Sequence, residues 1–441
     1  MPDRKRLNKD VSQKNEMEGA WGSMSFIAER DLQFARDAFR SYYRRPKQHI
    51  EIPRKIEKRE FGYFVFGEKI MVRHISLTEA NSLTRIFIDR APLHAYYSSA
   101  FFHSPSVPME KKGWMGAELV FDIDADHLPV GCKADHDFWL CKSCGKYGPK
   151  PAPKKCPTCQ REVEEIEWLC EICLREARNE LLKLLDFLEL SLGIRSKDIT
   201  LNFSGHRGYH LHVDNDHLNS MDQFARKEIV DYVTGNGLDL SQHGLYISTT
   251  SGTLIGPEYS DPSWRGKIAR GVYDLLGQLP DPSYEAQFRG ALTSKIYRRF
   301  LKRQEALMKL WSSRPVWGVA SGIKPDDWIK LAELAVRMQA ARIDTVVTTD
   351  VHRLIRMINT LHGKTGLLSL RIDHDEVEDF DPFRDSVVFP DHPSIKMKVL
   401  YSPRFRIKDK TYGPYHNEVV EVPFCTAMFM VCKGVSTISS G

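Results

Sequence analysis

The chain of 441 residues is too long for one simple core, and two to four structural units are the natural expectation. Its 42% hydrophobic and 27% charged residues match an ordinary globular protein, and no apolar run approaches the roughly 18 residues that a membrane span needs. The N-terminus "MPDRKRLNKDVSQKNEMEG" lacks the apolar core of a signal peptide, so an intracellular protein is expected. The net charge of +5 permits nucleic-acid binding without requiring it.

Helical and strand-like patterns alternate in the first part of the chain. A helix is predicted from about Phe26 to Arg44, followed by strands in "EFGYFVF" and "KIMVRHI" and a helix over about 78–89. The next strand, in "ELVFDIDADHLP", places Asp122 and Asp124 on one face, where two carboxylates repel unless a cation lies between them. A solvated strand end and a pair of metal-ligating carboxylates both fit this stretch taken alone.

A cysteine-rich block follows, with seven of the nine cysteines between Cys132 and Cys173. In a chain without a secretory signal, CxxC pairs favour metal binding over disulfides. The knuckles "CKSCG" and "CPTCQ" are typical of a zinc ribbon, and His136 supplies the fourth ligand for the other three cysteines. An iron–sulfur cluster is the alternative, and His136 alone could be a surface residue. Two structural zinc sites are therefore predicted: Cys141, Cys144, Cys156 and Cys159; and Cys132, His136, Cys170 and Cys173. The remaining thiols, Cys425 and Cys432, fall in an apolar stretch and are expected in the core.

After an amphipathic helix in "EICLREARNELLKLLDFLEL", two strands flank the turn "SGHRGYH" at 204–210. Small residues let the backbone approach a ligand, and a guanidinium grips phosphate oxygens through two hydrogen bonds. The turn therefore suits a polyphosphate, with an ordinary polar hairpin as the alternative. Its candidate ligands are Ser204, His206, Arg207 and His210.

Residues from about 216 to 342 are predicted to be mostly helical, and mixed strand and helix returns from Ile343. "ARIDTVVTTDVHRLIRMINTLHGKTGL" places Asp344 in a strand-like run and then brings Arg356, His362 and Lys364. A third carboxylate and a second group of cations are what nucleotidyl transfer by two divalent ions requires. Two basic stretches, 294–310 and 395–410, are each better explained singly as solvated faces than as phosphate tracks.

Four motifs, "VFDID", the cysteine knuckle, "SGHRGYH" and "IDTVVTTDVHRLIR…LHGKTG", occur in the order found in the catalytic small subunit of archaeal and eukaryotic DNA primase. The chain resembles this family from about residue 25 to near the C-terminus. The resemblance implies an α/β archaeo-eukaryotic primase (prim) fold with an inserted zinc-binding module and a helical insertion. The expected division is a polar extension (1–25), a catalytic body (26–129, 176–215 and 343–441), a zinc module with ribbon insertion (130–175) and a helical insertion (216–342).

Residue roles also follow from the resemblance. Asp122, Asp124 and Asp344 match the family's catalytic carboxylates, which hold Mg²⁺ or Mn²⁺. The zinc site with His136 resembles the one beside the family's active centre, whereas the ribbon is an elaboration that many members lack. Nucleotide-binding positions are matched by Arg59, Ser204, His206, Arg207, His210, Arg356, His362 and Lys364, and the place of His206 is arginine in some members.

The implied function is de novo primer synthesis from nucleoside triphosphates on single-stranded DNA, as the catalytic subunit of a heterodimer with a large primase subunit. A cytoplasmic, nucleoid-associated location is expected. A stand-alone primase-polymerase of DNA repair is the alternative within the family. A haloacid-dehalogenase-like phosphatase also carries Asp-x-Asp after a strand, but it expects threonine or valine at the place of Asp126. A zinc-dependent nucleic-acid-binding module without catalysis leaves the three carboxylates unexplained.

Overall fold

The computed structural model describes residues 28–45, 50–68, 70–318 and 322–439, so the expected N-terminal extension lies outside the described residues. The chain forms two compact units. Unit 1 comprises Met1–Asn179, Lys197–Gln223 and Asp344–Gly441, and unit 2 comprises Glu180–Ser196 and Phe224–Ile343. In the described part of the chain, none of the helices combines the length and the apolar character that a bilayer crossing demands.

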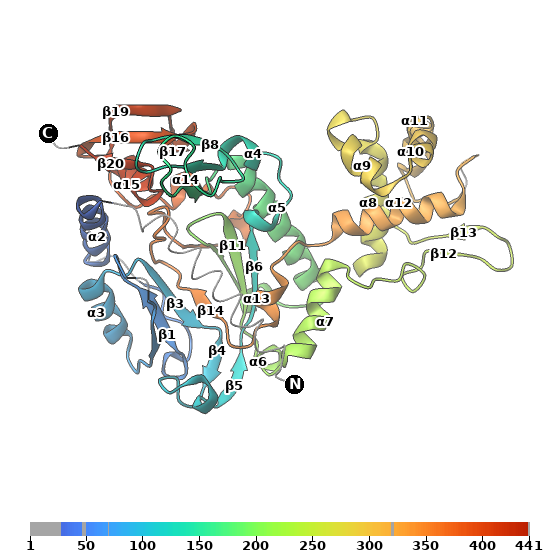
Figure 1. Cartoon of the computed structure of the whole chain (residues 1–441). Coiled ribbons are helices and arrows are strands. Elements are labelled where there is room, and N and C mark those ends of the chain that lie inside the picture. The colour runs from blue at the N-terminus through green and yellow to red at the C-terminus, as the bar shows by residue number, and fades with distance from the viewer. Residues whose placement is uncertain (1–27, 46–49, 69, 319–321, 440–441) are drawn as a thin grey trace, which may run out of the picture. The chain divides into compact units, whose positions relative to one another are not determined.

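Unit 1 contains an antiparallel sheet in the order β14-β3-β1-β2 (Figure 1). Its neighbouring helix α2 has an apolar stripe that buries Phe39 and Tyr42, as its amphipathic pattern predicts. The helices and strands expected here from the sequence are confirmed where they are described. Their bounds are α2 (Glu29–Tyr43), β1 (Phe61–Phe64), β2 (Val72–Ile75), α3 (Ala80–Arg90), β3 (His94–Ser98) and β14 (Leu354–Arg356).

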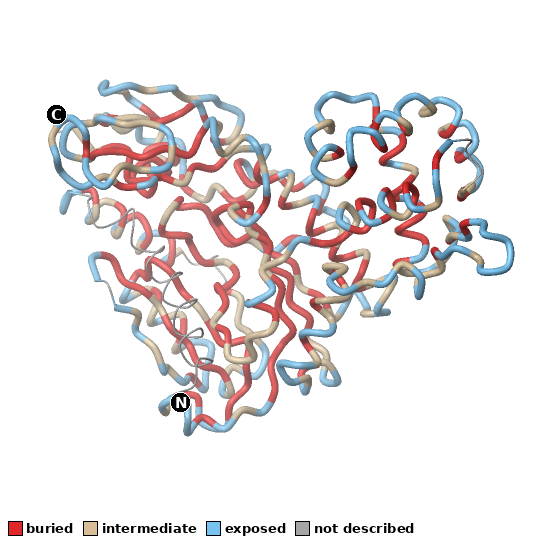
Figure 2. The backbone as a smooth tube through the Cα atoms, turned by 45° about the vertical axis from the view of Figure 1, so that its right-hand side comes forward, coloured by how far each residue is buried: buried red, intermediate tan, exposed pale blue. Residues whose placement is uncertain are grey.

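A second antiparallel sheet of unit 1, in the order β15-β10-β11-β6, carries the "VFDID" motif. Its strands are β6 (Leu119–Asp124), β10 (Ile199–Phe203), β11 (Gly208–Val213) and β15 (Leu370–Ile372). β11 is buried along its whole length. Buried residues (red) fill the interior of the structure, and exposed ones (pale blue) lie mostly at its edges (Figure 2). The register pairs His210 with Asp122 and Gly208 with Asp124, which brings the "SGHRGYH" turn to the carboxylate end of β6.

Smaller elements complete unit 1. In the C-terminal part, β16 lies between β19 and β20, and the largely apolar α15 packs against them, so Cys425 and Cys432 are confirmed as buried thiols. The bounds here are α14 (Pro382–Asp385), β16 (Ser394–Ser402), β17 (Phe405–Ile407), β18 (Lys410–Tyr412), β19 (Tyr415–Pro423), α15 (Phe424–Cys432) and β20 (Ser436–Ile438). The other elements are β4 (Ala100–Phe102), β5 (Trp114–Ala117), α4 (Lys133–His136), β7 (Phe138–Leu140), β8 (Tyr147–Pro149), β9 (Glu164–Ile166), α6 (Asp216–Asn219) and α13 (Thr345–Thr349).

Unit 2 is mainly helical, in agreement with the sequence pattern. Helices α8 and α12 lie side by side (Figure 1), and Trp311 stacks on Trp328 with ring centroids 5.3 Å apart. Helix α5 (Glu171–Asp186) runs from unit 1 into unit 2, and α7 (Gln223–Thr234) begins at their chain boundary. The other elements are β12 (Tyr246–Ile247), β13 (Leu254–Ile255), α8 (Ser263–Gln278), α9 (Glu285–Ala291), α10 (Ser294–Leu301), α11 (Gln304–Trp311) and α12 (Pro325–Gln339).

The strand predicted around Asp344 was wrong. Asp344 is the N-cap of helix α13, and its Oδ1 accepts hydrogen bonds from the backbone N–H groups of Val346 (2.9 Å) and Val347 (3.4 Å). The β-branched Thr and Val residues suggested a strand, but an aspartate that satisfies two backbone donors at the start of a helix outweighs that preference.

Candidate active site

The three aspartates predicted from the sequence line one cavity of unit 1, which has a volume of about 440 Å³ and is also lined by Asp126. Asp122 and Asp124 project from the same face of β6, two positions apart. Asp344 reaches the cavity from the start of α13, where its backbone N–H donates to the carbonyl oxygen of Asp122 at 2.8 Å. The structure therefore brings together all three carboxylates predicted from the sequence.

Burial raises the pKa of Asp122 well above its ordinary value, and the negative charges of Asp124 and Asp344 raise it further. Among the described residues, only the two cysteine groups bring three or more ligand atoms within 4.8 Å of one another. The three aspartates thus share a cavity at a wider spacing. Carboxylates in this position favour a bound cation, because a cation relieves both the burial of charge and the mutual repulsion.

Histidines and cations line the same cavity. They include His206 and His210 from the "SGHRGYH" turn and β11, Arg356, His362 and Lys364 from the second basic motif, and His94 from β3. The rings of His206 and His362 stack with centroids 4.9 Å apart and planes 4° apart. Burial lowers the pKa values of both histidines well below their ordinary value, and the neighbouring Arg356 and Lys364 lower them further. At neutral pH these imidazoles are therefore uncharged hydrogen-bonding groups beside Arg356 and Lys364.

The backbone of the turn holds its side chains in place. The Oγ of Ser204 accepts hydrogen bonds from the backbone N–H groups of His206 and Gly208, both at 3.3 Å. A Cβ atom at Gly208 would lie 2.0 Å from the carbonyl oxygen of Ile123, so only glycine lets β11 approach the end of β6 this closely. Gly205 has a φ of +83°, which also favours glycine.

Two arginines predicted to bind nucleotide do not line this cavity. Arg59 is fully buried elsewhere in unit 1, where it forms an ion pair with Glu118 and donates to the carbonyl oxygen of Ser98 at 2.7 Å. Arg59 therefore does not reach the cavity in this structure, because its donors already have partners in the protein, and its approach to the incoming nucleotide stays a prediction. The sequence around an arginine next to a strand does not indicate whether its guanidinium will face the cavity or the protein core.

Arg207 is also fully buried, behind the cavity. Its guanidinium forms an ion pair with Asp126, lies 3.5 Å from Asp137 and donates to the carbonyl oxygen of Trp168 at 3.1 Å. In this structure it joins the turn to the cysteine-rich segment and does not face the cavity. The predicted phosphate contact of Arg207 is thus replaced by a positioning contact with neighbouring acids.

Further residues of the cavity carried no recognisable motif. Glu167 lines it with its carboxylate 3.7 Å from the Nζ of Lys364. Strand pairing places Tyr96 opposite Arg356, which donates to the Tyr96 hydroxyl at 3.2 Å. Behind the cavity, the fully enclosed Lys433 donates to the carbonyl oxygen of Glu167 at 2.8 Å and contacts Nε2 of His206 at 3.2 Å.

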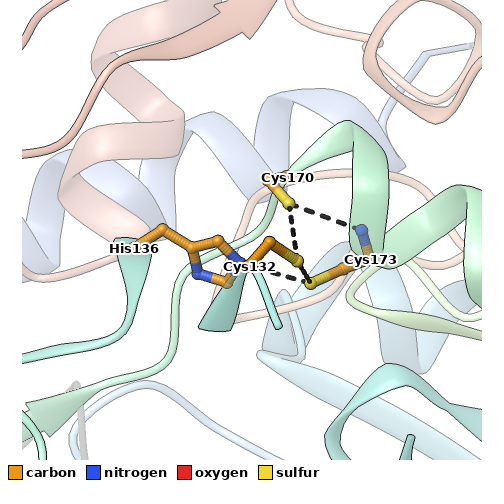
Figure 3. Close-up of side chains that lie close together, drawn as sticks. All are labelled: Cys132, His136, Cys170 and Cys173. Carbon is orange, nitrogen blue, oxygen red and sulfur yellow. Dashed lines mark hydrogen bonds between the residues drawn. The ribbon is translucent and has the colours of Figure 1, made fainter. Parts of the chain in front are cut away.

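The two predicted zinc-ligand groups are each gathered by the fold. Cys132, Cys170, Cys173 and His136 form the first group (Figure 3). The Sγ atoms of Cys132 and Cys173 lie 3.3 Å apart, and those of Cys132 and Cys170 lie 3.6 Å apart. These spacings approach the roughly 3.8 Å that a tetrahedron with Zn–S bonds of about 2.3 Å requires.

The histidine of this group has the orientation of a metal ligand. Its Nε2 faces Cys173 Sγ at 3.2 Å, and its Nδ1 lies 3.0 Å from Oδ1 of Asp137. A carboxylate on the far nitrogen of a ligating histidine fixes the tautomer that leaves the other nitrogen free for metal. The residues present therefore fit zinc.

The second group is the ribbon, where Cys141 and Cys159 lie 3.5 Å apart and Cys144 and Cys156 lie 3.6 Å apart. Tyr147 of the ribbon stacks on Tyr401 of β16 with ring centroids 3.5 Å apart and planes 10° apart. This contact attaches the ribbon to the C-terminal sheet of unit 1.

Comparison with known proteins decides the family. The family model described as DNA primase small subunit matches residues 153–374. The DNA primase small subunit PriS of Methanococcoides burtonii is 31% identical over 91% of this chain and 97% of its own length. The chain belongs to the DNA primase small subunit family.

Other relatives agree along nearly the whole chain. The DNA primase small subunit PriS of Nitrosopumilus maritimus is 29% identical over 93% of this chain and all of its own length, and that of Cenarchaeum symbiosum is 30% identical over 93% of this chain. This primase small subunit is thus a nucleotidyltransferase of DNA replication with a mixed α/β fold. The phosphatase and the non-catalytic binding module are not favoured.

Proposed function

We propose that the cavity joins nucleoside triphosphates de novo on a single-stranded DNA template. The observation that carries this proposal is the meeting of three carboxylates with a group of histidines and cations around one cavity of about 440 Å³. Carboxylates bind hard divalent ions, and cations with neutral donors bind a triphosphate. A phosphatase of the Asp-x-Asp type would need no such group of triphosphate ligands.

Asp122, Asp124 and Asp344 would hold Mg²⁺ or Mn²⁺. Their donor set is all oxygen, which these ions prefer, and their spacing, too wide for all three to share one ion, would suit more than one ion. When bound, such ions activate the attacking hydroxyl and neutralise charge on the departing pyrophosphate. The protein's part is to fix the three carboxylates, through the β6 backbone and the N-cap of α13.

The triphosphate would lie against Ser204, His206, His210, Arg356, His362 and Lys364. Arg356 and Lys364 supply positive charge, whereas the buried imidazoles supply neutral donors whose orientation is set by stacking. The pairing of Lys364 with Glu167 is weak enough, at 3.7 Å, to be exchanged for a phosphate oxygen.

The cysteine groups would hold two zinc ions with a structural role, since each offers four protein ligands and leaves no position open for substrate. The site with His136 ties α4 to the start of α5. The division into catalytic body, zinc module and helical insertion stays a proposal, as do the large-subunit partner and an intracellular, nucleoid-associated location.

One experiment tests the central proposal. Purified protein is incubated with single-stranded DNA, labelled nucleotides and Mg²⁺ or Mn²⁺, with and without an added primer. De novo products that disappear on chelation of the divalent ion are expected. Extension only of a supplied primer would contradict initiation and favour a polymerase of the repair type.

A further inference from the structure

A strongly basic surface in unit 2 is not explained by the catalytic cavity. It follows one side of α10 and continues just beyond the helix, and it lines a hollow of about 470 Å³. The residues repeat at intervals of four, which places them in two adjoining rows along a helix. This surface, the α10 basic face, consists of Ser294, Lys295, Arg298, Arg299, Lys302 and Arg303.

The opposite side of α10 is buried in unit 2, so the basic face must point away from the core. Ile296, Tyr297 and Phe300 are buried, and Phe300 packs edge-on against Trp328 of α12 with ring centroids 5.1 Å apart. The Tyr297 hydroxyl donates to the carbonyl oxygen of Leu279 at 3.1 Å. The apolar side is thus held in the core of unit 2, and the helix cannot insert that side into a lipid surface.

The charges on the α10 basic face are mostly not neutralised by the protein. Arg299 pairs with Asp327 at 2.6 Å. Within the described part of the chain, the other four cations form no ion pair, and no acidic residue lines the hollow. Like charges four residues apart destabilise a helix by about 0.2–0.5 kcal/mol per pair, so stability alone does not account for this arrangement. The face therefore offers unneutralised positive charge to an anionic ligand.

We propose that the α10 basic face binds the sugar–phosphate backbone of nucleic acid, as a second contact distinct from the catalytic cavity. Helix α10 rises about 9 Å from Lys295 to its last residue, Leu301, and Lys302 and Arg303 extend the row just beyond it, so the face spans about three phosphates of one strand. A linear row of cations suits a polymer better than a single compact anion. Family membership contributes only the expectation that the anionic polymer is a nucleic acid. Single-stranded and duplex DNA both present this phosphate backbone, so the face could contact either.

The test uses the full-length protein and needs no nucleotide or catalysis, so it is independent of the proposed carboxylate mechanism. The triple variant Lys295→Gln, Arg298→Gln, Lys302→Gln is compared with the control Lys309→Gln, Lys330→Gln, Arg337→Gln. The control removes the same charges from exposed positions of α11 and α12. Binding of a labelled 30-nucleotide single strand and of the matching duplex is measured across a salt series, and thermal unfolding verifies the fold.

The α10 variant should bind DNA about tenfold more weakly at low salt, and the slope of log affinity against log salt should fall by about 2 for the single strand. The control should retain wild-type binding. If the α10 variant loses affinity only for the duplex, the backbone contact is supported and the duplex is identified as the form of DNA that the face binds. Equal effects of both triple variants, or an unchanged slope in the α10 variant, would overturn the proposal. A loss of nucleoside triphosphate binding with DNA binding intact would overturn it as well.

Discussion

The backbone N–H of Asp344 donates to the backbone carbonyl oxygen of Asp122 at 2.8 Å. The first and third carboxylates of the candidate site are therefore joined through the main chain, and the spacing between α13 and β6 does not depend on their side chains. Substitutions that change only a carboxylate should leave this link in place.

The first prediction follows from that link. Asp122→Asn, Asp124→Asn and Asp344→Asn should each abolish nucleotide incorporation, because the divalent ions lose a charged ligand and with it several kcal/mol of transition-state stabilisation. Asp122→Asn also removes a buried charge beside two others, so the metal-free variant should melt no lower than wild type. Incorporation assays and thermal unfolding measure both effects. Near-normal incorporation by a variant would remove that residue from the mechanism.

A second prediction separates Lys364 from Arg207. Lys364 lines the cavity, so Lys364→Ala should weaken nucleoside triphosphate binding by about 10- to 150-fold, the effect of one charge-assisted hydrogen bond. Arg207 is buried against Asp126 and Asp137, so Arg207→Ala should lower the free energy of unfolding by about 3–5 kcal/mol. Calorimetric titration and chemical denaturation distinguish the two. If Arg207→Ala is fully stable and loses only triphosphate affinity, Arg207 turns towards the nucleotide in the working enzyme.

The third prediction concerns Lys433, which contacts Nε2 of His206 from behind the cavity. Lys433→Met keeps the side-chain volume but frees the imidazole to rotate. We expect the KM for nucleotide to rise about 3- to 10-fold, the value of one hydrogen bond, with kcat and the unfolding temperature little changed. Lys396→Met, at an exposed position of β16, is the control. An unchanged KM would show that His206 is held by stacking on His362 alone.

A fourth prediction concerns the cysteine groups. Elemental analysis should find about two zinc ions per chain, one per four-ligand group. Replacing Cys156 and Cys159 with serine should remove one ion and spare incorporation on simple templates. Replacing Cys170 and Cys173 should disturb α5 and the surrounding part of unit 1. Cys425→Ser, at a buried thiol outside both groups, should keep both ions. One zinc in the wild type, or an iron–sulfur absorption band, would contradict the assignment.

The fifth prediction concerns pH. The pKa values of His94, His206 and His362 are lowered well below 6.5, chiefly by burial, whereas in the unfolded chain they return to about 6.5. The unfolded state therefore takes up protons first as the pH falls, so this contribution to stability is complete above about pH 6.5 and is lost below it. Each histidine should add about 1.4 kcal/mol per pH unit to the slope of the unfolding free energy. The slope between pH 6 and 5 should be shallower in His362→Gln, and an unchanged slope would refute the prediction.

Sequence patterns located the parts of the site that follow from local rules. The alternation in "VFDID" placed Asp122 and Asp124 on one face. Three CxxC pairs, completed by Cys132 and His136, predicted two groups of metal ligands, as the structure has them. The same rules failed at Asp344, where β-branched residues indicated a strand and an N-cap formed instead.

Other parts of the site depend on contacts between distant segments. Glu167, Tyr96 and Lys433 belong to no motif, and only strand pairing and packing bring them near the cavity. Arg59 and Arg207 show the converse: each lies in a recognisable motif, yet a neighbouring acid determines where its guanidinium lies. A single sequence holds no signal for these pairings.

The hydrogen bond between Asp344 and Asp122 joins two residues that are far apart in the sequence, because the residues of unit 2 lie between them. During synthesis the ribosome therefore releases both Asp122 and Asp124 long before their third partner exists. Contacts between residues so distant in sequence form late, because the intervening chain must first be ordered. The active site would consequently be among the last features to form, and a chain cut short before Asp344 could never assemble a complete set of carboxylates.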